Sequence, residues 1–222
     1  MSDAVGWMCA DLCAPVARTL FATDARGADN VDNGAYAAVA SDVSQETVLS
    51  CAEVSVAPGF SMMREDQAFE GLRDPALPLA RHKPVSMLPQ EVFDKPAAEW
   101  LDLFTGLWRF ADHISLGESR VVLLLAQLLT SDARASGHKV VSLQDNFVTA
   151  SMYAKGRSGK LPLNFLARRK GAFCVAGNLT MMLPRVETYH QPADGSSRLA
   201  LHLPSSGPRP EAAGQTPISG GR

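Results

Sequence analysis

The chain lacks several features that would place it in a specialised class of protein. Its longest apolar run, from Val121 to Leu129, is interrupted by Gln127 and is too short to span a bilayer. The first residues, Met1 to Trp7, contain neither the basic stretch nor the apolar stretch of a signal peptide. We therefore expect no membrane association and an intracellular location, cytoplasmic or nuclear.

The chain also has few cysteines and a small net charge, which argue against a structural zinc site and against general attraction to nucleic acid. Four cysteines occur in 222 residues, and the close pair Cys9 and Cys13 has no second pair to complete a structural zinc site. We expect these thiols to be reduced. The net charge of -2 gives no overall attraction to nucleic acid, so contact with nucleic acid would depend on a local basic segment.

The apolar content of 46% and the length of the chain are typical of one globular domain with its own core. We expect a lead-in segment over residues 1–14, a domain over 15–200, and a disordered tail over 201–222 that is rich in Gly, Pro and Ser. Prolines at 75, 78, 84, 89 and 96 predict an irregular insertion over about 65–99.

The hydrophobic pattern predicts alternating strands and helices. Strands over 17–25 and 35–41 flank a Gly-, Asn- and Asp-rich turn and form a hairpin. The clearest helix covers 115–133, with Ser115 and Glu118 spaced as a capping box and Gly137 ending it. The other expected elements are a helical segment over 45–56, a short strand over 59–64, a helix and then a strand over 100–110, a strand over 139–144, helices over 145–156 and 163–176, and a strand over 178–188.

Four carboxylates stand where regular elements meet turns: Asp24, Glu118, Asp145 and Asp194. Each also has a purely structural explanation. Asp24 fits a turn, Glu118 fits the capping box, and the two later aspartates fit helix caps. Taken together, they favour a metal site. Asp24 and Asp145 end predicted strands, where ligands gather in such sheets, and several carboxylates are the ligand set that Mg²⁺ prefers for phosphate chemistry.

Six segments occur in an order that resembles the ribonuclease H domain of reverse-transcribing elements, most closely retroelements of the DIRS type, which carry a tyrosine recombinase. The similarity covers roughly Asp11 to Arg198. The segments that carry it are Ala14–Ala25, His113–Arg120, Gln144–Asn146, Ala154–Ser158, Leu163–Arg169 and Gln191–Arg198.

This resemblance implies an α/β fold of the ribonuclease H type: a five-stranded mixed sheet, antiparallel across strands 1–3, parallel across strands 1, 4 and 5, and flanked by helices. It also implies an Asp-Glu-Asp-Asp active site made of Asp24, Glu118, Asp145 and Asp194. The first aspartate would bridge two Mg²⁺ ions, with Mn²⁺ as a possible substitute. The implied reaction is hydrolysis of the RNA strand of an RNA–DNA hybrid, leaving 3′-hydroxyl and 5′-phosphate ends.

The chain departs from the family pattern in three ways. The proline-rich insertion separates Asp24 from Glu118, and Gly117 stands where a larger apolar residue is expected. No Tyr-x-Asp-Asp polymerase motif is present. We therefore expect a detached portion of a longer polyprotein that includes a reverse-transcriptase polymerase domain, or a decayed genomic copy.

A basic segment without acids lies between the third and fourth carboxylates. Its charges are Lys155, Arg157, Lys160, Arg168, Arg169 and Lys170, a cluster that suits a nucleic-acid backbone but also suits a solvated helical face. Asn146 and Ser119 flank the acids and are candidates for contacts to RNA 2′-hydroxyls. His190, just before Asp194, is a candidate for proton movement or product release.

Two other functions remain open at this point. The first is a catalytically inactive domain of the same fold that binds nucleic acid or scaffolds a polymerase. The second is a DNA nuclease or recombinase component that uses the same metal chemistry.

Overall fold

The computed structural model describes residues 13–29, 33–55 and 89–199. Most of the expected lead-in, the expected strand over 59–64, the larger part of the insertion and the expected tail lie outside these residues.

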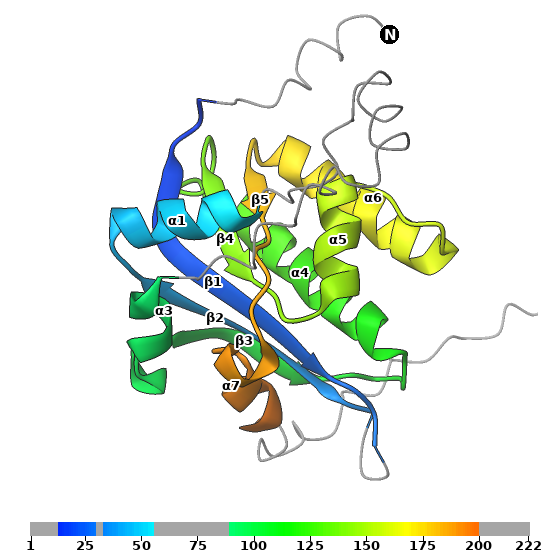
Figure 1. Ribbon diagram of the computed structural model, residues 1–222. Coiled ribbons are helices and arrows are strands. Elements are labelled where there is room, and N and C mark those ends of the chain that lie inside the picture. The colour runs from blue at the N-terminus through cyan, green and yellow to red at the C-terminus, as the bar shows by residue number, and fades with distance from the viewer. Residues whose placement is uncertain (1–12, 30–32, 56–88, 200–222) are drawn as a thin grey trace, which may run out of the picture.

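A five-stranded mixed sheet forms the centre of the described chain, in the order β3-β2-β1-β4-β5 (Figure 1). β1 pairs antiparallel with β2, which pairs antiparallel with β3. β1 also pairs parallel with β4, which pairs parallel with β5. The strand directions are those predicted for the α/β fold. The strands are β1 (Val16–Arg26), β2 (Ala35–Asp42), β3 (Leu101–Leu107), β4 (Lys139–Leu143) and β5 (Thr180–Met182).

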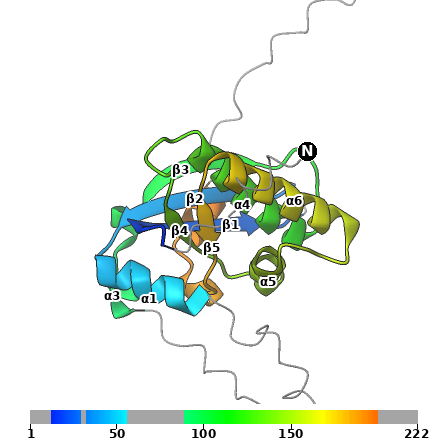
Figure 2. The ribbon, with the colours of Figure 1, turned by 90° about the horizontal axis from the view of Figure 1, so that it is seen from above.

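Helices cover both faces of the sheet (Figure 2). Those on one face are α4 (Ile114–Thr130), α5 (Phe147–Lys155) and α6 (Leu161–Ala176), which share one apolar core cluster. The opposite face carries α1 (Gln45–Ser55) and α3 (Gln90–Asp94), which belong to a second cluster. The short helix α7 (Asp194–Leu199) packs against β2 and β1, and 3-10 turns lie at Ala97–Glu99 and Thr188–His190.

β1 lies between two strands and under two layers of helix, which explains its apolar sequence. Successive side chains of a strand point to opposite faces. Leu20 and Ala22 accordingly belong to the cluster beneath α1, whereas Phe21 belongs to the cluster beneath α4. This buried central strand holds Asp24 near its carboxyl end.

Several predicted boundaries change in the structure. The segment over 100–110 contains the strand β3 and no helix, and it follows the 3-10 turn at Ala97–Glu99. The last strand is limited to Thr180–Met182, followed by a single bridge between Gln144 and Arg185. Pro184 has no N–H to donate to the strand ladder, which is the physical reason for the short pairing.

The expected capping box at Ser115 is wrong. α4 begins at Ile114, and its cap is His113, whose Nδ1 accepts a hydrogen bond from the backbone N–H of Ser115 at 3.2 Å. Ser115 therefore lies inside the first turn, and Glu118 is released for another partner. The helix also ends earlier than predicted, at Thr130, and Gly137 serves the turn before β4 with a φ of +75°.

α6 begins at Leu161, two residues before its expected start, because Pro162 fits the first turn of a helix. None of the helices in the described ranges is both long enough and apolar enough to cross a bilayer.

Gly34 gives the first prediction. It has a φ of +92°, and an added Cβ would clash with the carbonyl oxygen of Arg26 across the β1–β2 connection. We expect Gly34→Ala to lower the free energy of unfolding by about 2 kcal/mol or more. The matched control is Gly171→Ala inside α6, where no atom lies within 4 Å of an added Cβ. That substitution should raise stability by about 0.5–1 kcal/mol. Urea denaturation of both variants measures the difference, and equal effects would contradict the prediction.

Candidate metal centre

Strand register brings two aspartates together at the carboxyl ends of β1 and β4. Ala22 of β1 pairs with Leu143 of β4 in the parallel register, and Asp24 and Asp145 each lie two residues beyond this pair. Parallel strands end at the same side of a sheet, so both carboxylates reach the same region. Asp24 is 5% exposed, and Asp145 is half-buried.

The third carboxylate, Glu118, comes from the second turn of α4 and is 2% exposed. Its Oε1 accepts a hydrogen bond from the backbone N–H of Ala25 at 3.1 Å, which ties α4 to the end of β1. Gly117 faces the same junction. An added Cβ there would lie 3.4 Å from the Cβ of Ala25 and 3.5 Å from Nε1 of Trp108, which is ordinary van der Waals contact.

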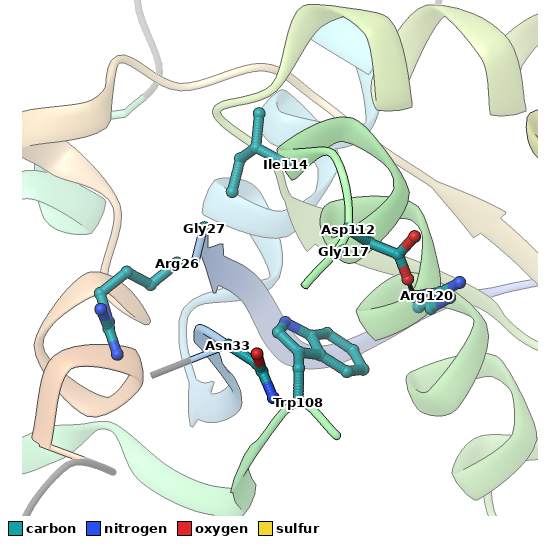
Figure 3. Close-up of a pocket in the computed structure, with 8 residues that line it drawn as sticks. All are labelled: Arg26, Gly27, Asn33, Trp108, Asp112, Ile114, Gly117 and Arg120. Atoms are coloured by element: carbon teal, nitrogen blue, oxygen red, sulfur yellow. Dashed lines mark hydrogen bonds and ion pairs between the residues drawn. The ribbon is translucent and has the colours of Figure 1, made fainter. Parts of the chain in front are cut away.

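A small pocket lies beside this junction and is drawn in Figure 3. The Trp108 indole packs against the Tyr36 ring at a tilt of 36°, with ring centroids 4.2 Å apart. Arg120 pairs with Asp112, and its guanidinium carbon is 6.0 Å from the centroid of the Trp108 ring. These contacts hold the first turns of α4 against the ends of β2 and β3. The pocket is lined by Arg26, Gly27, Asn33, Trp108, Asp112, Ile114, Gly117 and Arg120.

Asp24, Glu118 and Asp145 form one cluster. A carboxylate oxygen from each lies within 4.8 Å of the others. Within the described residues, Oε2 of Glu118 and Oδ1 of Asp145 are buried and have no hydrogen-bond partner. Buried carboxylate oxygens without partners are unfavourable unless a cation or a donor satisfies them. The donor set, three hard oxygens from three elements, fits a divalent cation such as Mg²⁺.

The fourth predicted acid, Asp194, lies close by but outside this cluster of three. It is the first residue of α7, and its carboxylate binds the guanidinium of Arg198 at 2.9 Å. The same helix reaches the cluster through Ser197, a fully buried residue whose hydroxyl donates a hydrogen bond to Oδ2 of Asp24. Asp194 still acts on Asp24 electrostatically, because its charge helps to raise the pKa of Asp24.

The purely structural explanations fail for the first three acids. Asp24 lies within β1 and not in the turn that follows. Glu118 does not belong to a capping box, and Asn146 rather than Asp145 caps α5. For Asp194, in contrast, the position at the start of α7 and the pairing with Arg198 fit the structural explanation.

Burial and mutual repulsion raise two pKa values in the cluster. Burial raises the pKa of Asp24 to about 6, with the charges of Asp145 and Asp194 acting in the same direction and the Ser197 hydrogen bond opposing them. Burial, followed by the charges of Asp24 and Asp145, raises the pKa of Glu118 to about 9. Without a cation, the cluster therefore retains protons that isolated carboxylates would lose.

Three supporting residues were missed by the sequence reasoning. They are Ser197 and two glutamines, Gln144 and Gln191. The side-chain amide of Gln144 donates to Thr23 Oγ1, and that of Gln191 donates to the carbonyl oxygen of Thr23 at 3.1 Å. The first bond holds the side chain of Thr23 and the second holds its backbone, so both fix the residue next to Asp24. Gln144 lies next to Asp145 in the sequence, and Gln191 and Ser197 each lie three residues from Asp194. This proximity could have marked them as supporting residues, but the sequence does not show that they are buried.

The predicted substrate-contact residues differ in their environments. Oδ1 of Asn146 caps α5 by accepting the N–H groups of Val148 and Thr149 at 3.0 and 3.1 Å. Ser119 is buried and bonded to the Ser115 carbonyl at 2.7 Å, so the proposal that it contacts RNA is wrong. The side chains of Lys155, Arg157, Lys160, Arg168 and Arg169 are exposed on α5, α6 and the turn between them.

His190 makes tilted contacts with two aromatic rings. Its ring centroid is 4.3 Å from that of Phe93 and 4.1 Å from that of Tyr189. This packing links α3 to the segment before α7, and it favours a structural role for His190.

The sheet order and strand directions define an α/β fold of the ribonuclease H-like class, as predicted. No protein-family model matches the chain, and no curated protein matches it. One solved structure with a measurable likeness is that of prototype foamy virus protease-reverse transcriptase, at 10% sequence identity and a TM-score of 0.34. The match covers 83% of this chain but spans only 19% of the viral chain. The fold assignment therefore rests on the sheet topology itself.

The raised pKa values predict how stability depends on pH. In an unfolded chain Glu118 and Asp24 titrate near 4.5 and 3.8, whereas in the folded chain their pKa values are about 9 and 6. Between these limits the folded state holds protons that the unfolded state has lost, so raising the pH favours unfolding by up to about 1.4 kcal/mol per pH unit for each group.

We therefore expect the melting temperature in EDTA to fall from pH 5 to pH 8. Glu118→Gln should flatten this decline, because the amide does not ionise. Mg²⁺ or Mn²⁺ should raise the melting temperature of the unmodified protein more at pH 8 than at pH 5. A melting temperature that rises over this range in EDTA would contradict the raised pKa values of the two groups.

Proposed function

We propose that the protein is a divalent-metal-dependent nuclease of the ribonuclease H type, which hydrolyses the RNA strand of RNA–DNA hybrids. The observation that carries the proposal is the convergence of three carboxylates: Asp24 and Asp145 at the carboxyl ends of two adjacent parallel strands, and Glu118 from α4. The substrate class comes from the resemblance of the sequence to the ribonuclease H domain of DIRS-type retroelements.

The cluster supports a metal-dependent reaction over an acid–base reaction by side chains alone. Three carboxylates that share one small volume repel one another, and their unsatisfied oxygens suit Mg²⁺ or Mn²⁺. We propose that Asp24, Glu118 and Asp145 hold two such ions, with Asp194 completing the set once its carboxylate leaves Arg198. Bound ions would supply an activated water and neutralise the charge that develops on the phosphate.

The chain's own residues hold the carboxylates in place for this chemistry. The N–H of Ala25 fixes one oxygen of Glu118, and the hydroxyl of Ser197 fixes one oxygen of Asp24. In these two carboxylates, one oxygen is thereby oriented by the protein, and the other is left for a ligand. Such preorganisation lowers the reorganisation required during reaction.

The exposed basic residues support a polyanionic substrate. Lys155 ends α5, Arg157 and Lys160 lie in the turn after it, and Arg168 and Arg169 lie on α6, so five exposed positive charges occur within two consecutive helices and the turn between them. We propose that they bind the hybrid backbone. By the same resemblance, we propose that a reverse-transcriptase polymerase domain accompanies this domain in a longer polyprotein.

The decisive test replaces one carboxylate of the cluster. Asp145→Asn should abolish Mg²⁺-dependent cleavage of a labelled RNA–DNA hybrid, with a loss of at least about 100-fold, because an amide is a poor ligand for a hard cation. Asp132→Asn is the matched control, since that exposed carboxylate at the far end of α4 pairs only with Arg134 among the described residues.

Duplex DNA and single-stranded RNA assayed beside the hybrid distinguish the alternatives. Cleavage of duplex DNA alone would indicate a DNA nuclease. Metal-independent binding of the hybrid without products would indicate an inactive binding domain. Full activity of Asp145→Asn would reject the proposed site.

The basic segment gives a separate prediction. Removing two phosphate contacts should weaken hybrid binding and lower the slope of log K against log salt by about 2. We expect this for Arg157→Ala/Lys160→Ala measured by fluorescence anisotropy in Ca²⁺. The control is Arg18→Ala/Arg134→Ala, which removes two charges from the opposite end of the sheet and should leave the slope unchanged.

A further inference from the structure

An exposed aromatic ring and an exposed guanidinium adjoin Asp145, and the proposed catalytic set does not use them. Phe147, the first residue of α5, is 64% exposed, and the neighbouring Val148 is 46% exposed. The guanidinium carbon of Arg185 lies 6.0 Å from the centroid of the Phe147 ring. Single exposed apolar side chains are common on protein surfaces, but this exposed ring is paired with an arginine whose Nε lies 3.5 Å from the carbonyl oxygen of Asp145.

The backbone on both sides of this pair is fixed. Arg185 forms the bridge to Gln144, with the N–H of Gln144 donating to Pro184 at 3.0 Å and the N–H of Val186 donating to Gln144 at 2.8 Å. Nε of Arg185 lies 3.5 Å from the carbonyl oxygen of Asp145. Phe147 is held by the helix that Asn146 caps. The ring and the guanidinium are therefore presented from a rigid base.

The guanidinium of Arg185 retains most of its donors. Among the described residues, it forms no salt bridge, whereas Arg120, Arg134 and Arg198 are each paired with an aspartate. An arginine that stacks on an aromatic ring can still present its N–H groups to a phosphate. An aromatic face beside it can pack against the sugar or base of the same nucleotide.

We propose that Phe147 and Arg185 form a nucleotide subsite on the Asp145 side of the metal centre, with the ring packed on a sugar and the guanidinium on its phosphate. The subsite rests on the proposed function, because it takes a nucleotide of the strand whose scissile phosphate lies at the carboxylates. It sets the position of the substrate along the site and takes no part in bond cleavage.

The test measures binding of a labelled RNA–DNA hybrid to the full chain in Ca²⁺, where affinity is read without cleavage. Phe147→Ala and Arg185→Ala should each weaken binding by about tenfold. Arg185→Ala should also lower the salt slope by about 1, whereas Phe147→Ala should leave it unchanged. The loss of affinity in the double variant should be smaller than the product of the two single losses, because the two side chains bind the same nucleotide. Phe147→Tyr should restore most of the affinity.

Matched controls remove an exposed apolar side chain and an exposed arginine elsewhere. Leu101, 69% exposed, lies at the other end of the sheet, and the side chain of Arg134 is 91% exposed. Leu101→Ala and Arg134→Ala should bind as the unmodified protein does. The rise in melting temperature caused by Mn²⁺ should be unchanged in Phe147→Ala, which shows that the carboxylates remain in place.

The subsite and the proposed function can fail separately. Normal hybrid affinity in both single variants, together with cleavage by the unmodified protein, would overturn the subsite alone. Binding without cleavage, with both variants weakened, would support the subsite and overturn the nuclease function. Absence of hybrid binding by the unmodified protein would overturn both.

Discussion

The structure depends on one electrostatic constraint, the confinement of three carboxylates within 4.8 Å of one another at the end of a buried sheet. Repulsion and loss of hydration both oppose this arrangement. The arrangement arises because the parallel register of β1 and β4 places Asp24 and Asp145 together at the carboxyl ends of these strands, and α4 brings Glu118 to them. Hydrogen bonds from the Ser197 hydroxyl and the Ala25 N–H offset part of this unfavourable free energy. A bound divalent cation would offset the rest.

Several hydrogen bonds from neighbouring elements hold the cluster in place. The bond from the Ala25 N–H to Glu118 ties α4 to the end of β1, and the buried amides of Gln144 and Gln191 bind the hydroxyl and the carbonyl oxygen of Thr23. α7 adds Ser197 from the end of the described chain. Rigid support of this kind matters more for a metal site than for an ordinary core, because ligand geometry determines affinity.

Most of the fold could be predicted from residue pattern. The hairpin, the long helix, the buried strand before Asp145 and the two helices after it follow from local periodicity and turn residues, which act over a few positions. Errors occurred where a distant contact overrode a local signal. Glu118 stands where a capping partner of Ser115 is expected, but it binds Ala25 instead. The short last strand follows from Pro184, whose effect depends on its pairing with β4.

The candidate site also divides into features set by local sequence and features set by distant contacts. The sequence alone identified Asp24, Glu118, Asp145 and Asp194 as candidates, because acids at the ends of strands and helices are a chemical signal that needs no coordinates. Only the tertiary structure decided that these three converge while Asp194 pairs with Arg198, and that Phe147 and Arg185 meet beside Asp145. The sequence determines residue type and local order directly, whereas distances between remote side chains depend on strand register and helix packing.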